Sequence, residues 1–145
     1  MKKFITAIIA TLMATSIFAT EVIKAENDSN LQILDLVIGV KQTYSQTSEL
    51  EAKVIELLGG DGLNPTRLVL ILGTGNPMEE KRIFSLGVAV YEVTRITFLD
   101  KDLIVINYFQ DDIDEEGKTS TVKRSMKIQV LRQASGELSG EIKIN

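Results

Sequence analysis

Carboxylates offer the clearest candidate chemistry in this sequence, in a short acidic run. Residues 112–117 (DIDEEG) place acidic side chains at the first, third and fifth positions and glycine at the sixth, as a calcium-binding loop does. Such a loop also needs a glutamate at the twelfth position, where this chain has Lys123, and a helix on each side, where it has strand-like residues. We therefore interpret residues 110–118 as a solvated hairpin loop and predict no metal site.

A glycine-containing turn is the second candidate. Gly73-Thr74-Gly75 follows a strand-like run, as the phosphate-binding turn of a nucleotide site does. The third glycine of that fingerprint is missing, and Pro77 with a charged segment stands where the fingerprint needs a helix. The pattern predicts an ordinary loop between two strands and no bound cofactor.

The residue types that are missing narrow the chemistry further. The chain contains no His, no Cys and no Trp. This excludes histidine-based triads, thiol nucleophiles, disulfides and the usual zinc and copper sites. A hydrolase would depend on carboxylates, on Ser with Lys, or on Tyr, and no spacing indicates two carboxylates that face each other across a cleft. We predict no catalytic residues and a protein that is not an enzyme.

The N-terminus resembles a secretory signal peptide in its layout. Residues 1–19 combine two early lysines, an apolar stretch and a small final residue, Ala19. A second possible cleavage site ends at Ala25. The apolar stretch is shorter than the roughly 20 residues that a membrane-spanning helix needs. We therefore expect export through a cleaved signal peptide to the periplasm or the extracellular space, with a bacterial envelope as the setting.

The charge balance limits the possible partners. Removing residues 1–19 takes away two of the 16 basic residues and none of the 20 acidic ones, so the net charge changes from −4 to −6. An acidic chain without a basic run argues against nucleic acid and against anionic lipid as partners. We expect the partner to be an envelope protein or another extracytoplasmic macromolecule, and the protein not to be an integral membrane protein.

The longest apolar and aromatic stretch outside the N-terminus, residues 83–109, is rich in Val, Ile, Thr, Tyr and Phe. These residue types favour strands, and the polar interruption at 100–102 favours a turn. The stretch predicts a two-stranded antiparallel hairpin at the centre of the domain. A two-residue turn pairs Phe98 with Leu103, whereas a three-residue loop pairs Leu99 with Leu103 and exchanges the two faces.

Two segments that precede residue 83 do not show a clear strand pattern. Ser48 with Glu51 matches a helix capping box, and four apolar residues and a glycine stop follow, so the pattern predicts a short amphipathic helix over residues 49–58. Residues 31–45 fit either a helix or a strand. Their β-branched content and the interior Gly39 favour the strand.

These elements define the expected fold class. We predict a mainly β protein, a single antiparallel β-sandwich or open barrel of about six or seven strands with one short packed helix. The alternative is an α+β fold with two N-terminal helices on an antiparallel sheet. A loose leader over residues 20–30 and a single β-rich domain over 31–145 complete the expected organisation. The best-marked remaining strands are 67–72, 121–131 and 138–144.

The function expected from these features is that of an exported non-catalytic envelope protein acting by surface binding, inhibition or structural contact. The first alternative is a carrier of a small apolar ligand, and the second is a carboxylate- or hydroxyl-based hydrolase. Three polar residues of the strands, Arg95, Asn107 and Arg124, could face a cavity, but each is explained more simply at a strand end or edge. We therefore predict no sizeable ligand cavity.

Overall fold

The computed structural model describes residues 21–25, 37–76 and 78–145, and these residues form strands and turns without any helix. Among them there is accordingly no helix of the length and apolarity needed to cross a membrane. The strands are β1 (Glu21–Lys24), β2 (Val37–Tyr44), β3 (Leu50–Leu58), β4 (Thr66–Thr74), β5 (Arg82–Val90), β6 (Glu92–Asp100), β7 (Leu103–Ile113), β8 (Thr119–Arg132) and β9 (Leu138–Ile144).

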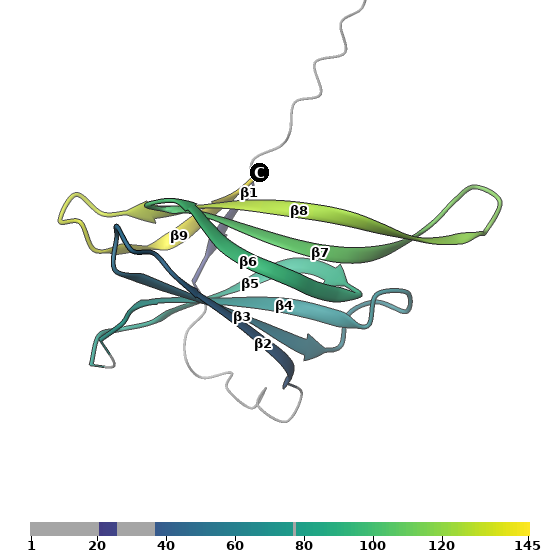
Figure 1. Ribbon diagram of the computed structural model, residues 1–145, viewed down its shortest axis with the longest axis horizontal. Helices are drawn as coiled ribbons and strands as arrows, with labels where there is room; N and C mark the ends of the chain where they lie inside the picture. The colour runs from purple at the N-terminus through teal and green to yellow at the C-terminus, as the bar shows by residue number, and fades with distance from the viewer. Residues whose placement is uncertain (1–20, 26–36, 77) are drawn as a thin grey trace, which may run out of the picture.

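The strands are arranged in two antiparallel sheets that pack face to face (Figure 1). One sheet has five strands in the order β1-β9-β8-β7-β6, and the other has four in the order β2-β3-β4-β5. The chain passes from the second sheet to the first at Tyr91, between β5 and β6. The prediction of a mainly β sandwich is therefore confirmed, and the sheets do not close into a barrel.

The core lies between the two sheets and follows from the alternation of each strand. In β3 and β4 every second residue points inward and is almost fully buried, as Ala52, Leu70 and Leu72 are. Phe84 of β5 is 0% exposed and is the largest of the fully buried side chains. Burying one such side chain stabilises the fold by about 1.5–3 kcal/mol. We call the sides that meet here the inner faces and the opposite sides the outer faces.

The predicted helix over residues 49–58 is wrong, because this segment is strand β3. It pairs along its length with β2 on one side and β4 on the other. The hydroxyl of Ser48 donates to the backbone carbonyl of Lys101 at 2.5 Å and caps no helix. Leu50 and Val54 satisfy a period of two as well as a period of four, so sheet pairing decides between the two structures.

The single hairpin predicted over residues 83–109 is also corrected. The stretch contains three strands, of which β5 belongs to the four-stranded sheet and β6 and β7 to the five-stranded sheet. Phe98 pairs with Ile104, which is the register of the three-residue loop. The register of this strand pair shifts at two points, between Val93 and Arg95 and between Phe98 and Asp100. Residues 88–98 contain no Gly, Pro, Asn or Asp, so no turn residue marks the change of sheets at Tyr91.

The N-terminal predictions have mixed outcomes. The strand favoured over 31–45 is confirmed for residues 37–44, which form β2, while 31–36 lie outside the described residues. The loose leader expected over 20–30 needs correction, because residues 21–24 form β1 and pair with β9. The predicted signal peptide, residues 1–19, lies outside the described residues. The strands predicted over 67–72, 121–131 and 138–144 lie within β4, β8 and β9.

Candidate functional site at the loop end

Four loops come together at one end of the sandwich, because consecutive strands run up and down between its two ends. They are residues 45–49, 75–81, 101–102 and 133–137, which join β2 to β3, β4 to β5, β6 to β7 and β8 to β9. This end, at the left in Figure 1, is called the loop end below. A rigid sheet scaffold that presents several loops together is a common arrangement of binding sites.

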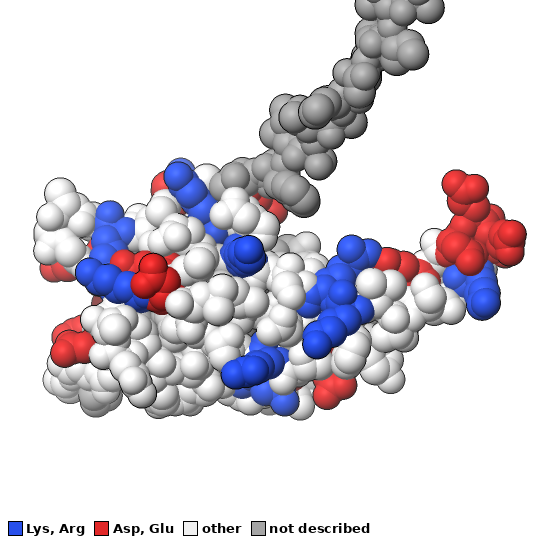
Figure 2. Space-filling view, turned by 45° about the horizontal axis from the view of Figure 1, so that its top comes forward, with Lys and Arg blue, Asp and Glu red and all other residues white. Residues whose placement is uncertain are grey.

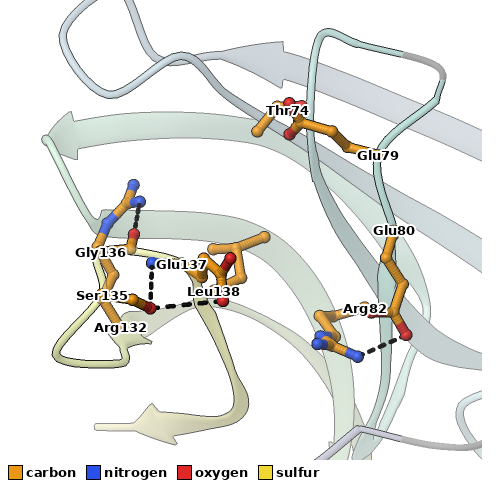
Figure 3. A pocket seen from close by; sticks show the side chains of 9 residues that line it. All are labelled: Thr74, Glu79, Glu80, Arg82, Arg132, Ser135, Gly136, Glu137 and Leu138. Atoms are coloured by element: carbon orange, nitrogen blue, oxygen red, sulfur yellow. Dashed lines mark hydrogen bonds and ion pairs between the residues drawn. The ribbon is translucent and has the colours of Figure 1, made fainter.

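One depression at the loop end has a volume of about 590 Å³ and lies between the β4–β5 and β8–β9 loops. Figure 3 shows Glu79, Glu80 and Arg82 on one wall, with the residues of the β8–β9 turn opposite. Arg82 is paired with Glu80 at 2.8 Å. Arg132 and Glu137 complete the charged lining, so this cleft is suited to polar and charged groups.

An arginine–carboxylate pair holds two of the loops in place. The guanidinium of Arg132 donates from Nε and Nη2 to Oδ1 of Asp102 at 2.9 and 2.8 Å, and from Nη1 to the carbonyl of Gly136 at 2.8 Å. The carbonyl of Asp102 also accepts the backbone N–H of Val130 at 2.8 Å. This bidentate, half-buried pair joins the β6–β7 turn to the β8–β9 turn and fixes one wall of the cleft.

Two smaller depressions, of about 400 and 360 Å³, adjoin the β2–β3 loop and share Tyr44 and Ser45 in their linings. Large apolar side chains stand exposed at the same end of the sandwich. Tyr44 is 58% exposed, Leu99 63% and Met78 91%. Tyr and Met are among the residue types that are enriched at the centre of protein interfaces.

Charged neighbours orient the tyrosine at the rim of these depressions. The hydroxyl of Tyr44 donates to Oε1 of Glu51 at 3.3 Å, and Nζ of Lys53 lies 2.8 Å from the same oxygen. The hydrogen bond from Lys53 is the main cause that holds the pKa of Glu51 below its ordinary value, and the same contact raises the pKa of Lys53. Both groups therefore stay charged at neutral pH and hold the tyrosine ring at the surface.

The acidic run at 112–117 forms the far end of the β7–β8 hairpin, away from the loop end. The carboxylate of Asp114 accepts the backbone N–H groups of Glu116 and Lys118 at 3.0 and 2.8 Å and so closes the turn. Asp112 is paired with Arg124. Among the described residues, no group of three or more acidic side chains is placed to hold a metal ion.

The other sequence candidates take ordinary structural positions. Gly73 and Thr74 end β4, and the Thr74 hydroxyl is hydrogen-bonded to Glu79 at the edge of the cleft. Arg95 and Asn107 lie on the outer face of the five-stranded sheet, where Asn107 accepts a hydrogen bond from Ser125 at 2.6 Å. The prediction that the protein encloses no sizeable ligand cavity stays a prediction.

Sequence reasoning missed the loop end because its parts come from four separate places in the chain. No single loop carries a motif, and only strand pairing brings the four together. Comparison with known proteins gives no match to a protein family, a curated protein or a solved structure. The geometry of the loop end is therefore the basis for a functional proposal.

Proposed function

We propose that this protein is an exported, non-catalytic binding module whose loop end contacts an envelope protein or another extracytoplasmic macromolecule. The observation that supports the proposal is the convergence of four loops, with exposed Tyr44, Leu99 and Met78 beside a cleft with charged walls. A rigid, pre-organised surface loses little conformational entropy on binding, which favours affinity. The Arg132–Asp102 pair supplies that rigidity here.

The two alternatives have less support from the same geometry. A carrier of a small apolar ligand needs an apolar pocket with a few orienting polar groups, whereas five of the nine residues that line the 590 Å³ depression are charged. A hydrolase needs an acid and a nucleophile held toward a common point. Glu79 instead accepts a hydrogen bond from the Thr74 hydroxyl. The Ser135 hydroxyl donates to Glu137 at 3.4 Å within the β8–β9 turn.

Site-specific photo-crosslinking tests the proposal. A photo-reactive amino acid is placed at Tyr44 or at Leu99, and separately at Ile113 as a matched control, because Ile113 is equally exposed at 59% but lies at the far hairpin. In cells that express the protein we expect discrete adducts from the two loop-end positions and none from Ile113. Adducts of equal yield from all three positions, or from Ile113 alone, would place the binding surface elsewhere.

A further inference from the structure

The outer face of the five-stranded sheet carries a group of exposed basic side chains from three strands, which we call the basic face. Its members are Arg95 of β6, Lys123 and Lys127 of β8, and Lys143 of β9. The pairing register puts them on one side of the sheet. Arg95 lies across Asn107 from Ser125, between the two lysines of β8, and Lys143 lies opposite Gln129.

The register also sets the spacing of these charges. With about 3.3 Å per residue along a strand and about 4.8 Å between strands, Lys123 and Lys127 are anchored about 13 Å apart. By the same spacing Lys143 is anchored about 8 Å from Lys127, and Arg95 about 12 Å from each β8 lysine. The four cations therefore form a row that runs along β8 and then turns across to β9, with Arg95 beside it.

Three carboxylates, those of Glu92, Asp111 and Glu141, share this side of the sheet with the four cations but form no ion pair with them. Among the described side chains, no ion pair joins any of the four cations to a carboxylate. Glu92 and Asp111 lie toward one end of the face, and Glu141 is paired with Lys24 at 3.8 Å. Figure 2 shows Lys and Arg side chains spread over this side of the body with a few acidic side chains among them, and a cluster of acidic side chains at the tip of the β7–β8 hairpin.

Four unpaired cations on one face of a protein with a net charge of −4 indicate a local surface for an anionic partner. The linear sequence hides this surface, because its members are separated by up to 48 positions, from 95 to 143, and only Lys123 has a basic neighbour, Arg124. A basic run is absent from the sequence, but a basic face is present on the folded sheet.

The side chains between the cations indicate the chemistry of the partner. Four of them are neutral hydrogen-bonding groups, Thr97, Asn107, Ser125 and Gln129, and two, Leu103 and Val105, are apolar. Single-stranded nucleic acid is bound mainly by stacking on several aromatic rings. Phe109, half-buried, is the one aromatic side chain that the described strands place on this face. Amide and hydroxyl groups beside lysines instead suit a polymer that carries both hydroxyl and acidic groups.

The hairpin tip argues against a flat membrane as the partner. In Figure 1 the tip of the β7–β8 hairpin turns toward the side on which the basic face lies. The tip carries Asp114, Glu115 and Glu116, so a planar anionic surface laid against the basic face would also meet these carboxylates. A linear polymer can follow the cations and avoid the tip.

We propose that the basic face binds a linear anionic polysaccharide, one whose sugar units carry carboxylate or sulfate groups. The cations attract its acidic groups, and the amide and hydroxyl side chains between them hydrogen-bond its sugar hydroxyls. This surface is separate from the loop end, so the protein can hold the polysaccharide on one side of the sandwich while the loops contact another partner. The proposal does not depend on the function assigned to the loop end.

A heparin octasaccharide is a suitable probe, and its binding to the purified protein is measured by titration calorimetry over a range of salt concentrations. The double variant Lys123→Gln/Lys127→Gln removes two of the four cations at exposed positions. Because each contact releases condensed counterions, we expect it to weaken binding about tenfold at low salt and to halve the slope of log affinity against log salt. The matched control Lys101→Gln/Lys118→Gln, with the same charge change elsewhere on the exposed surface, should leave both quantities unchanged.

Two further probes distinguish the polysaccharide from other anionic partners. We expect a thymidine oligonucleotide of similar charge to bind at least tenfold more weakly, and vesicles of phosphatidylglycerol and phosphatidylcholine not to bind. Equal or tighter binding of the oligonucleotide would overturn the proposal in favour of nucleic acid, and vesicle binding in favour of a membrane. Octasaccharide binding that is absent, or equal in the two double variants, would show that the basic face is not a polysaccharide site. Unchanged urea midpoints confirm that both variants fold.

Discussion

Two phenylalanines of residues 83–109 differ in how far their side chains are buried. This difference determines how much each side chain contributes to the free energy of unfolding. Phe84 is 0% exposed between the sheets, whereas Phe98 is half-buried near the loop end. We expect Phe84→Ala to cost about 3–5 kcal/mol, because it leaves a cavity in a packed core, and Phe98→Ala to cost clearly less. Urea unfolding measures both, with Glu115→Ala at the hairpin tip as a control expected within about 0.5 kcal/mol of the parent. Equal costs for the two phenylalanines would contradict this assignment.

Asp61 in the β3–β4 loop gives a prediction for pH dependence. Its Oδ1 accepts the backbone N–H groups of Asn64 and Leu63 at 2.5 and 2.8 Å, and these hydrogen bonds lower its pKa in the folded protein. The carboxylate therefore stabilises the fold above its unfolded pKa, and this stabilisation is lost as the pH falls through the lowered folded pKa. We expect Asp61→Ala to lower the melting temperature at pH 7, and the difference from the parent to shrink below about pH 4. A difference that stays constant down to pH 2 would contradict the role of the charge.

At the scale of elements, Gly39 of β2 and Glu56 of β3 fit together across the strand pair. The sequence of either strand alone does not predict this fit. A Cβ at Gly39 would lie 2.1 Å from Oε2 of Glu56, and the other oxygen of this buried carboxylate accepts the backbone N–H of Val93 at 2.6 Å. The absence of a side chain on β2 thus leaves room for a carboxylate on β3 that reaches across to β6. The preference for a strand at Gly39 could be predicted from composition, but the reason for the glycine could not, because Glu56 and Val93 are distant in sequence.

A double-mutant cycle tests this fit. Gly39→Ala displaces the carboxylate and should cost about 1.5–3 kcal/mol, the range for a hydrogen bond to a charged group. In a Glu56→Ala background the obstructing carboxylate is gone, so the same glycine substitution should cost clearly less. Chemical denaturation of the four proteins gives the coupling energy. Costs that add to within about 0.5 kcal/mol would show that the two residues act independently.

At the scale of the whole molecule, the sequence indicates which segments are β but not how they assemble. Alternation in residues 121–131 and 138–144 predicts their strands because each has one wet face. Segments with apolar residues on both faces do not show whether they form a helix or a strand. The capping-box match at Ser48 suggests a helix where sheet pairing produces β3. The loop end and the basic face could not be predicted at all, since each is built from residues that only the sheet order brings together.

The sheet order favours the first of the two predicted cleavage sites, after Ala19, over the second, after Ala25. Strand β1 pairs with β9 over four residues, Ile23 packs against the core, and the backbone N–H of Ala25 donates to the carbonyl of Gly140 at 2.6 Å. Cleavage after Ala19 keeps this strand, whereas cleavage after Ala25 removes it and leaves the edge of β9 without its partner. An unpaired edge of this length invites aggregation, and the burial of Ile23 would be lost.

We therefore expect cleavage of the predicted signal peptide to leave a mature chain that begins at Thr20. Intact-mass measurement of protein from the envelope fraction checks this directly, because the two sites give products that differ by the mass of six residues, 20–25. We also expect a chain that starts at Glu26 to unfold at a lower urea concentration than one that starts at Thr20, and to aggregate more readily. A mature mass that begins at Glu26, together with equal stability of the two chains, would show that β1 is dispensable and that β9 is the natural edge of the sheet.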